Sequence, residues 1–76
     1  MRLNEVFAKV LQAPVEEFTD ESSQDTVVSW TSLRHVALLV ELENTYKIKF
    51  SNAEMAAMRT VGDVRTALVR KGAEVL

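Results

Sequence analysis

The chain contains no cysteine and a single histidine, His35. Without cysteine it can form neither a disulfide framework nor a thiolate zinc site, and it has no cysteine nucleophile. One histidine leaves no pair of imidazoles to hold a metal, and neither a glycine-rich phosphate loop nor an EF-hand pattern is present. Ser32 lies three residues before His35, but no third group is visible to orient the imidazole as a base. We therefore expect no catalytic residues, no metal site and no intrinsic enzyme activity.

Long hydrophobic runs are also missing. The longest apolar runs are only a few residues, so no segment is expected to span a membrane, and Glu5 interrupts the apolar stretch that a signal peptide would need. A net charge of −2 lacks the positive balance that is usual for duplex binding. We expect a cytoplasmic protein with neither nucleic acid nor membrane as a partner, and a single small domain over residues 1–76.

The chain does show helical periodicity. Apolar residues recur at helical spacing, and Pro14 ends the first periodic segment. Ser51 with Glu54, and Thr60 with Asp63, have the spacing of a capping box. The pattern predicts helices over residues 2–13, 32–46 and 51–58, and a last helix from residue 60 to the segment Arg70-Lys71-Gly72. We expect an all-α protein, a small four-helix bundle with three main helices and a short third helix.

The predicted helices leave a long connection between the first and the second. Residues 14–30 are polar, and long loops inside small domains are uncommon and often functional. We expect three apolar residues, Phe18, Val27 and Trp30, to hold this loop to the helices. The expected buried face of the second helix consists of Val36, Leu39, Val40, Leu42 and Tyr46, with Leu38 at its border, and that of the last helix of Val61, Val64, Ala67 and Leu68.

The helix over residues 32–46 begins with two adjacent hydroxyl residues, Thr31 and Ser32. Thr31 is the natural N-cap, because its oxygen can accept a hydrogen bond from the free N–H groups of the first turn. Ser32 then lies beside the positive end of the helix dipole, where an attached anion gains about 0.3–1 kcal/mol. We interpret Thr31 as the structural hydroxyl and Ser32 as a candidate for a phosphate ester, which would make the chain a phosphoprotein.

The order and spacing of these motifs resemble the acyl carrier protein family. In that family an Asp-Ser-Leu motif opens the second helix, which continues with a leucine-rich and acidic pattern, and a Thr-Val-Gly-Asp-like motif starts the fourth. The corresponding residues here are Thr31-Ser32-Leu33, then Val36, Leu39, Leu42, Glu43, Tyr46, Ile48 and Phe50, then Thr60-Val61-Gly62-Asp63-Val64. The resemblance covers nearly the whole chain and needs no gap from residue 30 to residue 64.

The resemblance implies that Ser32 carries a covalent 4′-phosphopantetheine arm, transferred from coenzyme A by a separate Mg²⁺-dependent phosphopantetheinyl transferase. The thiol of the arm would hold an acyl group as a thioester, so the absence of cysteine would be no obstacle. The partners would then be this transferase, an acyl-loading enzyme and an acyl-receiving synthase or transferase. The second helix would be their docking surface, and the candidate docking residues are Leu33, Arg34, Ala37, Val40 and Glu41.

The chain departs from the family pattern at three positions. Thr31 stands where the family usually has Asp, and Arg34 and Ala37 stand at positions that are usually acidic. Charge steers encounter and partner choice more than it adds affinity, so we expect poor docking to enzymes that require an acidic second helix. That argues against a housekeeping fatty-acid carrier. The segment from Trp30 to His35 resembles a Trp-x-Ser-Leu-x-His pattern of discrete carriers in bacterial polyketide and related specialised pathways, such as antibiotic biosynthesis.

The sequence predicts a freestanding, monomeric carrier and leaves alternatives open. A start at Met1 and an end just after Gly72 favour a freestanding protein, and an exposed docking helix favours a monomer. An aminoacyl or peptidyl carrier is a close alternative, because partner enzymes choose the cargo. A helical protein-interaction module without a prosthetic group, in which Ser32 is a redundant cap, is an alternative from another class. A leucine-rich groove that binds lipid without covalent attachment is a third.

Overall fold

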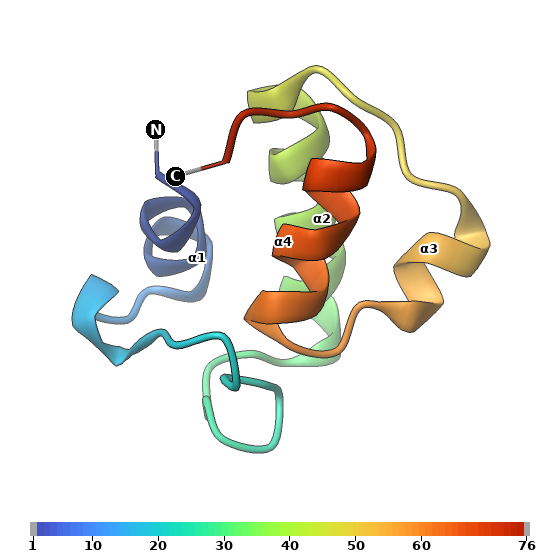
Figure 1. The fold of residues 1–76 in the computed structure, drawn as a ribbon. Helices are drawn as coiled ribbons and strands as arrows, with labels where there is room; N and C mark the ends of the chain where they lie inside the picture. The colour runs from blue at the N-terminus through green and yellow to red at the C-terminus, as the bar shows by residue number, and fades with distance from the viewer. Residues whose placement is uncertain (1, 76) are drawn as a thin grey trace.

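The computed structural model describes residues 2–75, and within them the fold is all-helical. The elements are α1 (Leu3–Leu11), the 3₁₀ turn η1 (Val15–Glu17), α2 (Ser32–Tyr46), α3 (Asn52–Ala57) and α4 (Val61–Arg70). Figure 1 shows α2 and α4 in the centre, α1 on one side of them and the short α3 on the other. The predicted four-helix bundle with a short third helix is confirmed.

The helix ends follow local signals in the sequence. The Ser51 hydroxyl caps α3 and the Thr60 hydroxyl caps α4, and in both cases the acidic residue three positions on completes the predicted capping box. The first helix is shorter than the predicted span 2–13, because Gln12 adopts a left-handed conformation (φ 55°) and its N–H donates to the carbonyl of Ala8. The helix α3 ends one residue earlier than predicted, at Ala57.

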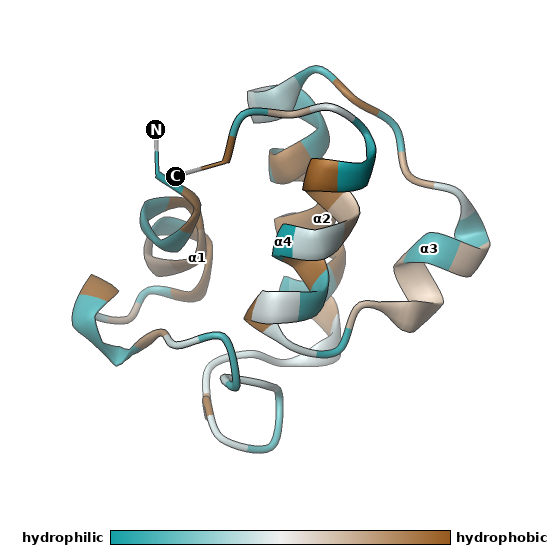
Figure 2. Ribbon diagram, in the orientation of Figure 1, coloured by the Kyte–Doolittle hydropathy of each residue, from teal (hydrophilic) through white to brown (hydrophobic). Residues whose placement is uncertain are grey.

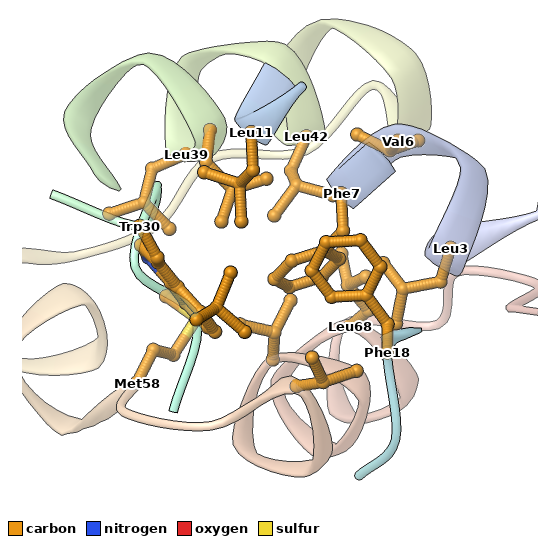
Figure 3. Packing of buried hydrophobic residues seen from close by; sticks show 14 of the residues in the cluster. Leu3, Val6, Phe7, Leu11, Phe18, Trp30, Leu39, Leu42, Met58 and Leu68 are labelled. Atoms are coloured by element: carbon orange, nitrogen blue, oxygen red, sulfur yellow. The ribbon is translucent and has the colours of Figure 1, made fainter. Parts of the chain in front are cut away.

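One hydrophobic cluster lies between the helices (Figure 3). Its centre is aromatic: the ring of Phe7 meets the indole of Trp30 edge-on at 5.2 Å between centroids and lies 5.7 Å from the ring of Phe18. Phe18 and Trp30 belong to the long connection, as does the buried Val27. The predicted role of these three residues in holding the loop to the helices is therefore confirmed.

The buried face of α2 differs from the one predicted. Leu38, which was expected at the border, is fully buried together with Leu42, and Leu39 is almost fully buried. Val36 and Val40 were expected in the core and are instead 61% and 51% exposed. Those two assignments were wrong because α2 carries two apolar stripes, and helical spacing alone does not tell which stripe faces the other helices.

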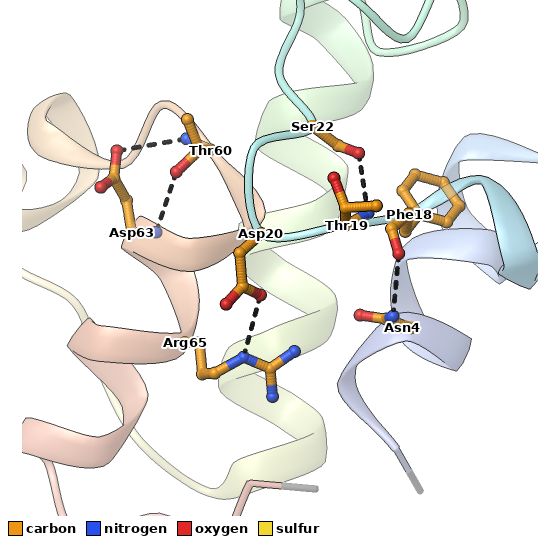
Figure 4. A network of polar contacts seen from close by, with 8 residues as sticks. All are labelled: Asn4, Phe18, Thr19, Asp20, Ser22, Thr60, Asp63 and Arg65. Carbon is orange, nitrogen blue, oxygen red and sulfur yellow. Dashed lines mark hydrogen bonds and ion pairs between the residues drawn. The ribbon is translucent and has the colours of Figure 1, made fainter.

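The long loop over residues 14–30, whose mostly polar character Figure 2 shows, contacts the start of α4. The N–H groups of Val61 and Gly62, which have no acceptor within the helix, donate to the carbonyls of Ser22 (3.0 Å) and Asp20 (2.9 Å), respectively. A Cβ atom at Gly62 would lie 3.1 Å from the Asp20 carbonyl oxygen, which is a tight contact, so a larger residue here would push the loop away by a few tenths of an ångström. The Asp20 side chain also pairs with Arg65 at 3.3 Å (Figure 4).

These contacts fix the loop on both sides of the bundle. Figure 4 also shows the Asn4 side chain of α1 donating to the carbonyl of Phe18 at 3.2 Å. The loop is thus joined to α1 at one point and to α4 at another before it reaches α2. In α4 itself, Val61, Val64 and Leu68 are buried as predicted, whereas Ala67 is only partly buried.

Candidate functional site

Ser32 is the first residue of α2, and its hydroxyl is not the one that caps the helix. Thr31 adopts an extended conformation (φ −83°, ψ 169°), and its Oγ1 accepts a hydrogen bond from the N–H of Arg34 at 3.2 Å. The Thr31 carbonyl accepts from the N–H of His35 at 2.8 Å. Thr31 is therefore the N-cap that the sequence predicted, and Ser32 is left exposed to solvent.

The backbone around Ser32 can receive an anion. The N–H groups of Ser32 and Leu33 donate to no group within residues 2–75, so they remain free at the first turn of a helix of 15 residues. Such N–H groups, together with the positive end of the helix dipole, favour a phosphate group. The local geometry thus fits a phosphate ester on the Ser32 oxygen. A hydroxyl that caps the helix, such as that of Thr31, would be less suitable because it already accepts a hydrogen bond from the backbone.

Two aromatic side chains hold the chain on either side of Ser32. Trp30 is 1% exposed, and its Nε1–H donates to Nδ1 of His35 at 3.0 Å. His35 must then be neutral with its own proton on Nε2, and burial lowers the pKa of His35, which favours the same neutral form. This bond gives the Trp-x-Ser-Leu-x-His pattern a physical meaning. The histidine at the start of α2 accepts a hydrogen bond from the N–H of the buried indole, which is the only polar group of that side chain.

The role of Trp30 in holding the loop to the helices was predicted from the sequence, but its hydrogen bond to His35 was not. His35 is partly exposed in the structure. The five-residue spacing between Trp30 and His35 was the available signal. It could not be interpreted without knowing that the backbone turns from loop into helix between them.

Arg34, a predicted docking residue, is turned toward α1. Its Nη1 donates to the carbonyl of Leu11 at 3.0 Å, and its Nη2 donates to Oε1 of Gln12 at 3.3 Å. The carbonyl of Leu11 is one of the free acceptors at the end of α1, so the guanidinium acts as a C-terminal cap for a neighbouring helix. This explains physically why a cation stands at a position where the family usually has an acidic residue.

Glu41, another predicted docking residue, is also paired with α1. Its Oε2 lies 3.2 Å from Nζ of Lys9 and 3.5 Å from the Thr45 hydroxyl. Glu41 is only partly exposed. The other predicted docking residues, Leu33, Ala37 and Val40, are exposed on the surface of α2.

No family model matches the chain, and no curated protein matches it in sequence. Among solved structures, it is similar to a protein of Mycobacterium tuberculosis that is described as an acyl carrier protein. The TM-score is 0.81 at 25% sequence identity, and the match covers 91% of this chain and 92% of that chain. This chain has the acyl carrier protein fold. The resemblance that the sequence motifs indicated is therefore confirmed.

In this acyl carrier fold, Val36 is the surface residue that sequence reasoning missed. It was counted in the core, yet it lies exposed between Leu33 and Val40. The spacing of three, then four residues along α2 was a usable signal, since it places all three side chains on one face. The competing buried stripe consists of leucines, whose larger side chains fill the core.

Neither a cluster of metal ligands nor a helix that could cross a membrane is found in residues 2–75. Among residues 2–75, no group of three or more His, Asp or Glu side chains could hold a metal ion. No helix in the same range is long and apolar enough to cross a bilayer.

Proposed function

We propose that the chain is a carrier that holds an acyl group as a thioester on a 4′-phosphopantetheine arm at Ser32. It delivers this group to partner enzymes of a biosynthetic pathway of the polyketide type. The observation that carries the proposal is an exposed Ser32 hydroxyl at the first turn of α2, beside a separate cap, in an acyl carrier fold. The arm supplies the thiol that a chain without cysteine lacks.

The residues around Ser32 divide the work of presenting the arm. Thr31 caps the N-terminus of α2, so that modification of Ser32 does not remove the cap. The free N–H groups of Ser32 and Leu33 stabilise the negative charge of the phosphate ester. Trp30 and His35 fix the backbone on both sides, so that the arm starts from a rigid point.

The carrier acts with separate enzymes and contributes no catalytic residue of its own. A phosphopantetheinyl transferase attaches the arm, an acyl-loading enzyme charges it, and an acyl-receiving synthase or transferase takes the cargo. These partners meet the carrier on α2, near Leu33, Ala37 and Val40, which are exposed beside Ser32. We further propose that the carrier works as a monomer in the cytoplasm, with neither nucleic acid nor membrane as a partner.

The test is the intact mass of the protein before and after incubation with coenzyme A, Mg²⁺ and a broad-specificity phosphopantetheinyl transferase. We expect the wild type to gain the mass of one phosphopantetheine. Ser32→Ala should gain nothing, and Ser29→Ala, which removes a hydroxyl three residues earlier, should react like the wild type. A gain on Ser32→Ala would place the modification elsewhere and refute the assignment.

The variant Thr31→Asp separates a mismatched transferase from an absent site. Aspartate is an equally good N-cap and restores the residue that the resembled family usually has before the modified serine. Modification of Thr31→Asp but not of the wild type would mean that the site is competent and that the enzyme discriminates at residue 31. A folded wild type and a folded Thr31→Asp that both stay unmodified with several transferases would refute the carrier function and favour an interaction module without a prosthetic group.

A further inference from the structure

The ring of His35 is held in one orientation and one protonation state. Its Nδ1 accepts a hydrogen bond from Nε1–H of Trp30 at 3.0 Å, and the centroids of the two rings lie 5.9 Å apart at an interplanar angle of 30°. A neutral imidazole that accepts at Nδ1 carries its proton on Nε2. Burial lowers the pKa of His35, which favours the neutral form. His35 therefore presents an N–H donor at Nε2 whose direction is set by the buried indole.

This donor has no acceptor among the residues that the structure describes. Within residues 2–75 the hydrogen bond of the His35 ring is the one that Nδ1 accepts from Trp30, and the side chain is partly exposed. His35 lines an open cleft together with Asp25 of the long loop and Arg59 of the link between α3 and α4. A donor that is fixed in direction, unpaired and open to solvent is available to a group that is attached nearby.

Ser32 is the attachment point that lies within reach of this donor. It precedes His35 by three residues on α2, and residues three apart on a helix are neighbours with about 5–6 Å between their Cβ atoms. Side chains on a helix lean toward its N-terminus, so the His35 ring leans toward the turn that contains Ser32. A phosphate on the exposed Ser32 hydroxyl extends beyond the Oγ atom, and its oxygens can then come within hydrogen-bond distance of the imidazole.

We propose that His35 is a positioning residue for the phosphopantetheine arm, because its Nε2–H donates to a phosphate oxygen of the ester on Ser32. The inference rests on the proposed carrier function and names a side chain that directs the arm. The phosphate is a diester, joined to Ser32 on one side and to the arm on the other, so a hydrogen bond to one of its free oxygens restricts rotation at the point of attachment. Since the imidazole is anchored to the buried Trp30, the restriction extends from the core to the arm.

The contact predicts a linked titration of the imidazole and the phosphate. A negative phosphate beside His35 favours the imidazolium, so the pKa of His35 should be higher in the protein with the arm than in the protein without it. A phosphate diester keeps one negative charge near neutral pH, so its ³¹P resonance moves with pH only through a neighbour. Asp25 and Arg59 are the other charged groups at the cleft, and their types titrate at about pH 4 and above about pH 12.

The test is ³¹P and proton NMR of protein whose loading with one arm has been verified by intact mass. Between about pH 4.5 and about pH 8, the wild-type ³¹P resonance should shift with the same midpoint as the ring protons of His35. The variant His35→Asn keeps an acceptor for the indole of Trp30 but has no titrating group, so the folded, fully loaded variant should give a flat ³¹P profile. Arg59→Gln removes a charge from the same cleft and keeps the imidazole, so its profile should keep the step.

Each outcome of this test bears on one of the two proposals. A flat ³¹P profile in the loaded wild type, an equal pKa of His35 with and without the arm, or a step that persists in His35→Asn would each overturn the phosphate contact and leave the carrier function standing. A wild type that never gains the mass of the arm would overturn the carrier function, and the contact with it.

Discussion

Removing the imidazole of His35 should destabilise the protein by leaving the indole N–H of Trp30 without an acceptor. Trp30 is 1% exposed, so water cannot replace the acceptor that His35 Nδ1 provides at 3.0 Å. A buried donor without a partner costs about 1–3 kcal/mol. For a domain of this size, 1 kcal/mol corresponds to a shift of roughly 4–8 °C in Tm. We therefore expect His35→Leu to lower Tm by on the order of 10 °C.

The matched control is His35→Asn. The side-chain oxygen of asparagine can lie where Nδ1 of the imidazole lies, so it can still accept from the indole, and most of the loss should be recovered. Guanidinium unfolding followed by the fluorescence of Trp30, the single tryptophan, measures all three proteins. A His35→Leu protein within about 0.5 kcal/mol of the wild type, the range of ordinary surface substitutions, would refute the reasoning.

The pH dependence of stability should report the same bond. Burial lowers the pKa of His35 below its ordinary value of about 6.5. The stabilisation is therefore complete above about pH 6.5 and is lost as the pH falls toward the lowered pKa, because the unfolded chain binds the proton first. Asp25 and Arg59, which carry opposite charges, line the same cleft as His35. In His35→Leu this dependence should disappear; a wild-type profile that persists in the variant would assign it to other groups.

Three further substitutions test the rest of the fold and site. Gly62→Ala should destabilise by roughly 1 kcal/mol in thermal unfolding, because the clash of its Cβ with Asp20 outweighs the gain in helix propensity; a more stable variant would show that the loop moves aside. Arg34→Ala should cost about 1 kcal/mol by removing the cap of α1 and leave kcat/KM with the transferase within about twofold, since its charge faces α1; a larger kinetic loss would return it to the docking surface. Leu38→Ala should cost about 2–5 kcal/mol in denaturant unfolding and Val36→Ala about 0.5 kcal/mol or less, and similar values for the two would contradict the observed burial of α2.

The helices and their caps were determined by the sequence over short distances. A capping box needs only residues three positions apart, so the starts of α3 and α4 could be predicted from Ser51 and Thr60. The cap at Thr31 could be predicted in the same way, and with it the exposed position of Ser32 at the start of α2. The resemblance of these motifs to the acyl carrier protein family also implied the acyl carrier fold, which the structural comparison supports.

What faces what was decided only by the tertiary structure. The helix α2 carries two apolar stripes, and Leu38 and Val36 could be assigned correctly only once the rest of the core covered one of them. Likewise, Arg34 is a surface cation in the sequence and becomes a cap only because the end of α1 lies beside it, 23 residues away. Periodicity and capping depend on neighbouring residues, whereas burial and charge pairing depend on segments that are distant in the chain and meet only when it folds.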